Sequence, residues 1–184
     1  FATGGIGGVH RGAETTLDIS ADLDELSRTN VCVVCAGVKS ILDIGLTLEY
    51  LETKGVPVIG YKTSELPAFY STKSGFNVDY RIDAAIDIAG ILKTKWDLSI
   101  DGGVLVTNPI PVAFELESSV MNEAINLAII EADNENITGK KITPYLLSKV
   151  NEITKGKSLD ANIKLIKNNA DLAAKIAVHF SKID

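Results

Sequence analysis

The feature that most constrains this chain is a run of five apolar residues, Val31 to Cys35, followed by a glycine turn. The length of the run and its β-branched residues predict a strand buried on both faces, which is typical of a parallel sheet. Gly37 allows a tight turn after the strand. A helix capped by Ser40 is predicted next, because apolar residues recur at helical spacing at Ile41, Ile44, Leu48 and Leu51.

Lys39 stands between this strand and this helix. Open α/β folds bind their ligands at the carboxyl ends of sheet strands, which is where this lysine is expected. A lysine amine in such a position can attack a carbonyl carbon. An ordinary surface lysine and a nucleophilic lysine are the two interpretations that position alone allows.

Further strands and helices follow the same alternation. Val56–Tyr61 and Gly102–Thr107 are predicted as buried strands, and strand, helix, strand within about 30 residues is the βαβ unit of a parallel sheet. Helices are predicted over 83–93 and 118–132, then from Thr143 and from Ser158, which is expected to cap the last helix. Residues 83–93 are expected to face inward through Ala85, Ile86, Ala89 and Leu92. The 184 residues fit one α/β domain, residues 1–184.

Composition excludes several classes of function. The net charge of −6 argues against a nucleic-acid polymer as partner, since phosphate backbones are bound by basic faces. No apolar run approaches the roughly 20 residues that span a membrane. Cys32 and Cys35 point to opposite faces of a strand, so we expect buried reduced thiols in an intracellular, cytoplasmic protein. The chain begins with Phe1, so we expect it to be part of a longer protein.

Two polar segments are candidates for ligand binding. Residues 4–12 contain five glycines, which indicate either a loop whose amides approach an anion or a flexible connection. In the following segment, Asp18, Ser20 and Asp22 share one side if the chain is extended, and Asp18 and Asp22 share a face if it is helical. Either way the two carboxylates suit Mg²⁺ or Mn²⁺ that keeps most of its waters. The alternative is a helix start capped by Ser20 or Asp22.

The last predicted helix has a core stripe of Leu165, Leu172, Ile176 and Phe180. Asn162 and Asn169 fall on the same stripe, although a buried amide is costly without hydrogen bonds. These two side chains therefore either fasten a neighbouring loop or touch a polar ligand.

Longer motifs carry a family resemblance. FATGGIGGVHRGAETTLDISADL, CAGVKSILDIGLTLEYLETKGVPV, PAFY, NPIP, GKKITPYLL and ANIKLIKNNA resemble the pseudouridine-5′-phosphate glycosidase family, also called the indigoidine synthase A family. The resemblance runs from Phe1 to about Ala177. It implies a three-layer α/β/α fold, a homotrimer, and a divalent metal, commonly Mn²⁺. Members of the family reversibly convert pseudouridine 5′-phosphate to uracil and ribose 5-phosphate.

The resemblance also implies roles for individual residues. Lys39 matches the lysine that forms an imine with C1 of the sugar, and Asp18 matches the metal ligand. Ser20, Ala21 and Asp22 match a substrate-binding segment, with Thr3, His10 and Asn162 as further substrate ligands. The family's glutamate proton donor lies in an N-terminal part that has no match here. An imine-forming sugar-phosphate aldolase and a non-catalytic ligand-binding or assembly fragment are the alternative functions.

Overall fold

The computed structural model describes residues 1–137 and 139–183, and its centre is a parallel sheet. The sheet has the strand order β2-β6-β4-β5, and every pair in it is parallel. Its strands are β2 (Cys32–Cys35), β4 (Val58–Tyr61), β5 (Tyr80–Ile82) and β6 (Val104–Thr107). The strands predicted over Val56–Tyr61 and Gly102–Thr107 are thereby confirmed as β4 and β6, and each starts two residues later than predicted.

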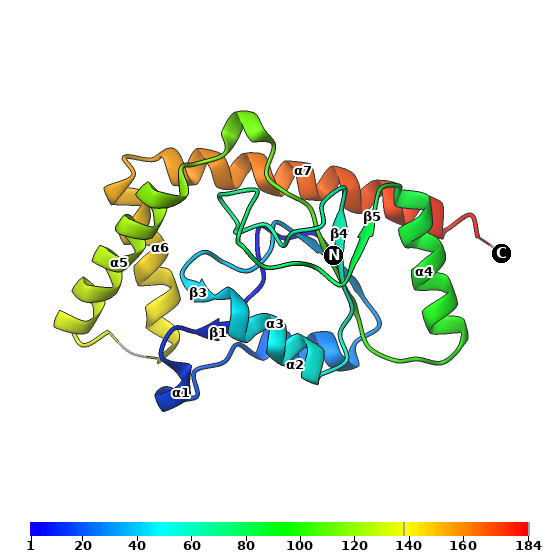
Figure 1. The fold of residues 1–184 in the computed structure, drawn as a ribbon, viewed down its shortest axis with the longest axis horizontal. Helices are drawn as coiled ribbons and strands as arrows, with labels where there is room; N and C mark the ends of the chain where they lie inside the picture. The colour runs from blue at the N-terminus through cyan, green and yellow to red at the C-terminus, as the bar shows by residue number, and fades with distance from the viewer. Residues whose placement is uncertain (138, 184) are drawn as a thin grey trace.

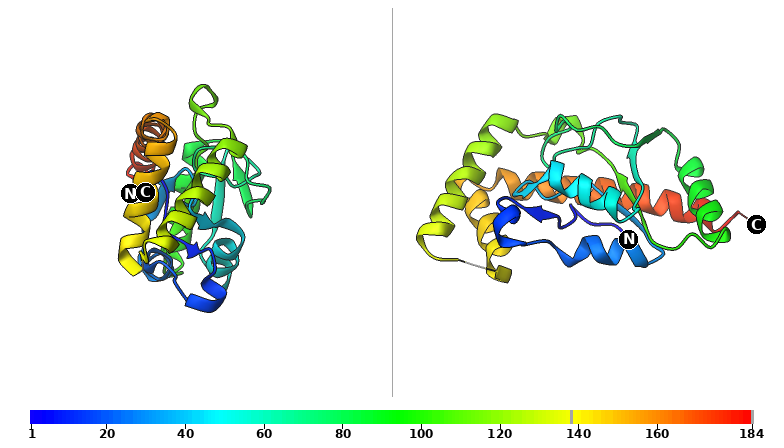
Figure 2. Two further views of the ribbon diagram at one scale, coloured as in Figure 1. Left: turned by 90° about the vertical axis from the view of Figure 1, so that its left-hand side faces the viewer. Right: turned by 60° about the horizontal axis from the view of Figure 1, so that its bottom comes forward.

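Helices cover both faces of this sheet (Figures 1 and 2). Leu23 and Leu26 of α2 and Leu51 of α3 pack with Val33 and Leu105 on one face. On the other face, buried residues of α4 and α7 pack with Val34, Ile59 and Val106. The three-layer α/β/α fold is therefore confirmed. The helices are α1 (Ala13–Thr16), α2 (Ala21–Arg28), α3 (Ile44–Thr53), α4 (Ala85–Asp97), α5 (Ser118–Asn134), α6 (Ile142–Ile153) and α7 (Lys157–Phe180), with short 3-10 turns at Val112–Phe114 and Gly139–Lys141.

The N-terminal end of the glycine-rich segment runs beside β2 and is joined to it by isolated bridges. Parallel bridges join Ala2 to Val34 and Ile6 to Val38. The amide of Thr3 donates to the carbonyl of Val34 at 3.0 Å, and the amide of Ile6 donates to that of Gly37 at 3.1 Å. Because these bonds anchor the segment, the flexible connection predicted as one alternative for residues 4–12 is wrong at residues 4–6, while anion binding by the glycine amides stays a prediction.

The helix after Lys39 starts later than predicted, at Ile44, because Asp43 and not Ser40 is its N-cap. The Asp43 carboxylate accepts a hydrogen bond from the amide of Leu46 at 2.9 Å. Leu42 and Asp43 form the short strand β3 (Leu42–Asp43), which pairs with β1 (Val9–His10). Lys39 therefore lies just before β3 in the chain and not directly at a helix N-terminus.

Other helix boundaries and faces differ in smaller ways. In α4 the inward position is Ile88, which is fully buried, while Ile86 is 54% exposed. α6 begins at Ile142, one residue before Thr143. α7 begins at Lys157 after Gly156, whose left-handed backbone (φ 83°) takes the cap position expected for Ser158. The inward stripe of α7 is confirmed, with Leu165, Leu172 and Ile176 buried.

The two cysteines are free and belong to opposite faces of the sheet, as predicted. Burial raises the pKa of Cys32 to about 11 and that of Cys35 to about 12. Both side chains therefore behave as packed apolar groups at neutral pH. In the part of the chain that the structure describes, we find no helix with the length and apolar character that crossing a membrane requires.

Candidate active site

Lys39 follows the carboxyl end of β2, beyond the turn at Gly37. Gly37 has φ 93°, and a Cβ there would lie 2.0 Å from the carbonyl oxygen of Pro67, so only glycine fits. The backbone of Lys39 is fixed on both sides, because its amide donates to the carbonyl of Ile6 at 3.1 Å and its carbonyl accepts from the amide of Leu42 at 2.9 Å. The sheet therefore holds the base of this side chain rigidly.

An open hollow of about 410 Å³ lies beside Lys39. Its polar side chains are Thr3, Asp22, Glu25 and Lys39. The rest of its wall is apolar or glycine and consists of Phe1, Gly5, Ile6, Leu26, Val31 and Val33. Three of the residues predicted for the site, Lys39, Thr3 and Asp22, thus line one hollow. An amine, a hydroxyl and carboxylates against an apolar wall suit a polyhydroxylated ligand.

The start of α2 brings Asp22 to this hollow. Ser20 is the N-cap of α2, and its hydroxyl accepts from the amide of Asp22 at 3.3 Å, so the predicted cap is confirmed. The amide of Gly7 donates to Oδ2 of Asp22 at 2.7 Å. Ala21 is the first residue of the helix and is exposed. The segment Ser20–Asp22 is therefore an ordered helix start that faces both the glycine segment and the hollow.

The glycines bring the N-terminal segment close to its neighbours. A Cβ at Gly7 would lie 2.1 Å from the Ser20 hydroxyl, one at Gly5 would lie 2.5 Å from the Phe69 ring, and one at Gly4 would lie 2.8 Å from Oδ1 of Asn162. Close approach between backbone and side chains is thus the reason for glycine at these positions.

His10 and Asp18 line a different hollow, of about 160 Å³, together with Ile129 of α5 and Ile142 and Leu146 of α6. Nδ1 of His10 is 3.9 Å from Oδ2 of Asp18. The expectation that Asp18 and Asp22 share one side is wrong, because the chain turns at extended Ser20 and sends the two carboxylates into different hollows.

Asp18 fits a divalent cation that keeps most of its water ligands, because its carboxylate is open to water. Among the described residues, no group of three or more His, Cys, Asp or Glu side chains could hold a metal ion. The Asp18 carboxylate is 37% exposed, so it offers a single hard oxygen ligand open to water. A cation bound there would keep most of its waters, as Mg²⁺ and Mn²⁺ do.

Asn169 and Asn162 differ in their partners. Asn169 is fully buried, donates to the carbonyl of Thr3 at 2.8 Å and accepts from Nδ2 of Asn108 at 3.2 Å. Asn169 therefore fastens the N-terminal segment, which confirms for this residue the first of the two predicted roles, fastening a neighbouring segment or binding a polar ligand. Oδ1 of Asn162 is buried without a hydrogen-bond partner among the described residues. Asn162 does not line the Lys39 hollow, although its neighbour Gly4 lies between the hollow-lining residues Thr3 and Gly5.

Ser40, next to Lys39, faces a third hollow. This hollow has a volume of about 560 Å³ and is also lined by Arg11, Asp43, Lys73 and Ser118. The Ser40 hydroxyl is buried and has no hydrogen-bond partner within residues 1–137 and 139–183. Residues 39 and 40 thus face different hollows.

Sequence reasoning missed Glu25 in the Lys39 hollow. The signal was present, because Glu25 lies three residues after Asp22 and α2 therefore presents both on one side.

The fold and the hollow define an α/β/α protein that holds a lysine and two carboxylates beside the edge of a parallel sheet. The chain belongs to the family described as indigoidine synthase A like protein, whose model matches residues 1–179. The resemblance drawn from the sequence motifs is thereby confirmed.

Curated relatives and solved structures agree with this assignment. The chain is 60% identical over 184 residues to the pseudouridine-5′-phosphate glycosidase of Clostridium botulinum, covering 100% of this chain and 60% of that protein. It is 64% identical over 181 residues to the enzyme of the same name from Geobacillus kaustophilus, covering 98% of this chain and 60% of that protein. The chain thus spans about three fifths of the length of these relatives.

Two solved structures share the fold. The prealnumycin C-glycosynthase AlnA, in complex with ribulose 5-phosphate, matches with a TM-score of 0.90 and 38% identity, over 97% of this chain and 59% of that one. An indigoidine synthase A-like protein from Thermotoga maritima matches with a TM-score of 0.89 and 37% identity, over 98% of this chain and 59% of that one.

Proposed function

We propose that the protein to which this chain belongs reversibly cleaves the C–C glycosidic bond of pseudouridine 5′-phosphate, giving uracil and ribose 5-phosphate. The observation that carries the proposal is the hollow that Lys39 shares with Thr3 and Asp22. Relatives that share about 60% of its residues bear the name of this enzyme, and a neighbour of the same fold binds ribulose 5-phosphate. A sugar phosphate is therefore the class of ligand that we assign to the hollow.

Lys39 supplies the nucleophile in this proposal. Its Nζ forms a bond to C1 of the ribose as the bond from C1 to the ring oxygen breaks, and that oxygen takes a proton. The nitrogen lone pair then forms C=N as the bond from C1 to uracil breaks, leaving the electron pair on uracil C5, which takes a proton. Water hydrolyses the imine, which releases ribose 5-phosphate and restores the amine. The sum is one water consumed for each bond cleaved.

The neighbouring residues bind and orient the sugar. Thr3 offers a hydroxyl from a backbone that is held between β2 and α7. Asp22 offers the carboxylate oxygen that the Gly7 amide does not occupy. We assign substrate contacts also to Ser20 and Ala21 at the start of α2, to His10, and to Asn162, whose buried Oδ1 has no partner within the described residues.

We further propose that Asp18 holds a hydrated Mn²⁺ or similar divalent cation. Its half-open carboxylate and the nearby His10 support this assignment. When bound, the cation would supply positive charge and ordered water at this hollow. His10 would orient the carboxylate from its other side.

The proposal concerns a protein longer than this chain. The family's glutamate proton donor is assigned to a part that these residues do not contain. We also propose a homotrimer in the cytoplasm. Support comes from free thiols at Cys32 and Cys35 and from an outward apolar stripe on α5, where Val120, Leu127 and Ile130 are 52%, 45% and 56% exposed. Light scattering gives the mass of the assembly directly.

Borohydride trapping tests the nucleophile without the proton donor. The protein is incubated with ribose 5-phosphate and Mn²⁺, reduced with borohydride, and digested for peptide mass spectrometry. The expected result is an adduct on Lys39 that is absent from Lys39→Ala and present in Lys93→Ala, a control in an exposed ion pair with Asp97 on α4.

The synthetic direction separates the alternative functions. Joining uracil to ribose 5-phosphate supports the glycosidase. Cleavage of a phosphorylated ketose without this joining would favour an aldolase. Absence of a Lys39 adduct both in this chain and in a protein extended to the length of its relatives would remove the imine mechanism.

A further inference from the structure

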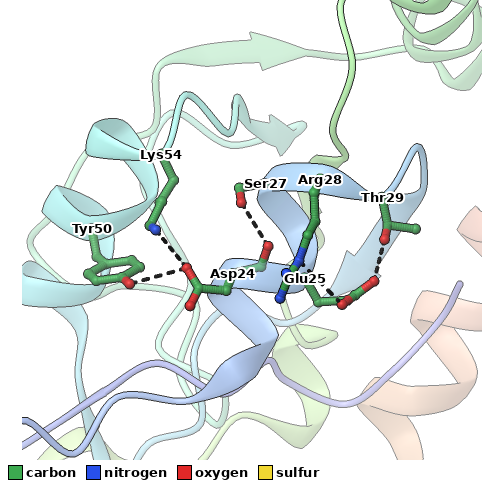
Figure 3. Close-up of polar contacts among 7 residues, drawn as sticks. All are labelled: Asp24, Glu25, Ser27, Arg28, Thr29, Tyr50 and Lys54. Atoms are coloured by element: carbon green, nitrogen blue, oxygen red, sulfur yellow. Dashed lines mark hydrogen bonds and ion pairs between the residues drawn. The ribbon is translucent and has the colours of Figure 1, made fainter.

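Two carboxylates on α2 line the Lys39 hollow, and only one of them has been given a role. Asp22 and Glu25 are one helical turn apart, so they lie on the same side of α2, and both line the hollow with Lys39. Asp24, between them, points toward α3. There the Lys54 amine is 2.7 Å from Oδ1 of Asp24, and the Tyr50 hydroxyl donates to the same oxygen at 3.3 Å (Figure 3).

The contacts of Glu25 hold its carboxylate without using all of its hydrogen-bonding capacity. The Thr29 hydroxyl donates to Oε1, and Nε of Arg28 is 3.7 Å from Oε2 (Figure 3). Both partners come from the same stretch of chain, at the end of α2. An ionised carboxylate has about four acceptor positions, so further donors can bind. The Glu25 side chain is 63% exposed, which leaves it open to a ligand.

The charges of the hollow decide which part of a sugar phosphate this carboxylate can bind. Glu25 and Asp22 repel a phosphate group, while neutral hydroxyl groups donate to carboxylates readily. When C1 is bonded to Lys39, the first hydroxyl along the sugar is that of C2. A carboxylate that lines the same hollow as the attacking amine is suited to accept from this hydroxyl.

We propose that Glu25 is a specificity-determining residue that accepts a hydrogen bond from the 2-hydroxyl of the ribose bound at Lys39. This inference rests on the proposed function, because it takes a ribose phosphate as the ligand. It assigns to Glu25 the discrimination between ribose 5-phosphate and 2-deoxyribose 5-phosphate.

The test measures borohydride-trapped adduct on Lys39 against the concentration of each sugar phosphate. For the unmodified protein, we expect half-maximal trapping at a concentration of ribose 5-phosphate at least about tenfold lower than for 2-deoxyribose 5-phosphate, as loss of a hydrogen bond to a charged group implies. For Glu25→Ala, the two concentrations become equal within about twofold, through weaker trapping of ribose 5-phosphate only. Glu25→Gln, which keeps an acceptor oxygen, gives an intermediate ratio.

Two control variants separate recognition from a structural role. Arg28→Ala removes the ion-pair partner of Glu25, and Asp24→Asn weakens the contacts with Lys54 and Tyr50 on the other side of the helix. Both should keep the preference for ribose 5-phosphate. Arg28→Ala reproducing the loss seen in Glu25→Ala, or Glu25→Ala retaining the full preference, would overturn the inference. Complete absence of adduct, both in this chain and in a protein extended to the length of its relatives, would instead count against the imine chemistry, and so against the proposed function itself.

Discussion

The amide of Gly7 donates a 2.7 Å hydrogen bond to Oδ2 of Asp22, which joins the N-terminal glycine segment to the first turn of α2. This bond fixes the Asp22 carboxylate at the Lys39 hollow. It exists only because the two segments approach more closely than any side chain at position 7 would allow. The binding residues on α2 and the glycine segment therefore form one structural unit.

Gly7→Ala should damage this unit. The new Cβ would lie 2.1 Å from the Ser20 hydroxyl and 2.9 Å from Oδ2 of Asp22, so the start of α2 must move. We expect the free energy of unfolding to fall by about 1 to 3 kcal/mol, measured by urea denaturation. The matched control is Gly90→Ala inside α4, where the Cβ meets nothing within 4 Å, and it should raise stability by up to about 1 kcal/mol. Equal stabilities for the two variants would contradict the close packing at Gly7.

Asn169→Ala should destabilise the protein because it removes the hydrogen bonds of a fully buried side chain. The carbonyl of Thr3 and Nδ2 of Asn108 each lose one hydrogen bond. We expect a loss of about 2 to 3 kcal/mol in the free energy of unfolding. Lys167→Ala, on an exposed position of the same helix, controls for helix propensity and should change stability by less than about 0.5 kcal/mol. A similar urea concentration at the midpoint of unfolding for both variants would show that the buried side-chain amide of Asn169 is dispensable.

Glu115 should make stability depend on pH in the acidic range. Burial raises the pKa of this carboxyl, but hydrogen bonds from the amide and hydroxyl of Thr72 and the hydroxyl of Ser71 lower it more, so the net shift is below the ordinary value of 4.5. The Glu115 carboxyl then binds a proton less tightly in the folded state than in the unfolded state. The ionised carboxylate therefore stabilises the fold above pH 4.5, and this stabilisation is lost as the pH falls through the folded-state pKa.

The check is the difference in unfolding free energy between the unmodified protein and Glu115→Gln, measured between pH 7 and pH 3. This difference should be constant near neutrality and should shrink at the acidic end. Glu123→Gln, at an exposed position of α5, should give a difference that is small at every pH. A Glu115→Gln difference that grows on acidification would have the wrong sign for the hydrogen bonds described.

Asp18→Asn should weaken binding of Mn²⁺ if Asp18 is the metal ligand. Loss of the negative oxygen removes the protein's direct bond to the cation, so we expect an affinity lower by at least about tenfold, measured by electron paramagnetic resonance of free Mn²⁺. Asp22→Asn, in the other hollow, should leave the affinity unchanged. The assignment is refuted if Asp22→Asn weakens the Mn²⁺ affinity while Asp18→Asn leaves it unchanged.

The sequence predicted the elements whose signals are local. β2 and β6 were found from their apolar runs, and α7 from the spacing of Leu165, Leu172 and Ile176. The cap of α3 was misplaced because Ser40 and Asp43 are both good N-caps, and the pairing of Leu42 with His10 decides between them. That pairing joins residues 32 positions apart and leaves no local signal.

The site was predictable only in part for the same reason. The motifs named Lys39, Thr3 and Asp22, which line one hollow, but the hollow between His10 and α6 depends on how helices far along the chain pack. The glycine segment was misread in part because composition alone does not distinguish a flexible connection from an anchored segment that needs close neighbours. Glu25 lay within reach of a simple helical-periodicity argument.

The bond between Asn169 and Thr3 also bears on the order in which the protein folds. It joins residues 166 positions apart, so nearly the whole chain must be closed into a loop before it forms. Such long-range closure slows folding, since its entropic cost comes before the contact rewards it. A ribosome that has not yet released α7 therefore holds a chain whose segment at Thr3 is unanchored on one side. We expect the wall of the Lys39 hollow to become rigid only after synthesis of α7 is complete.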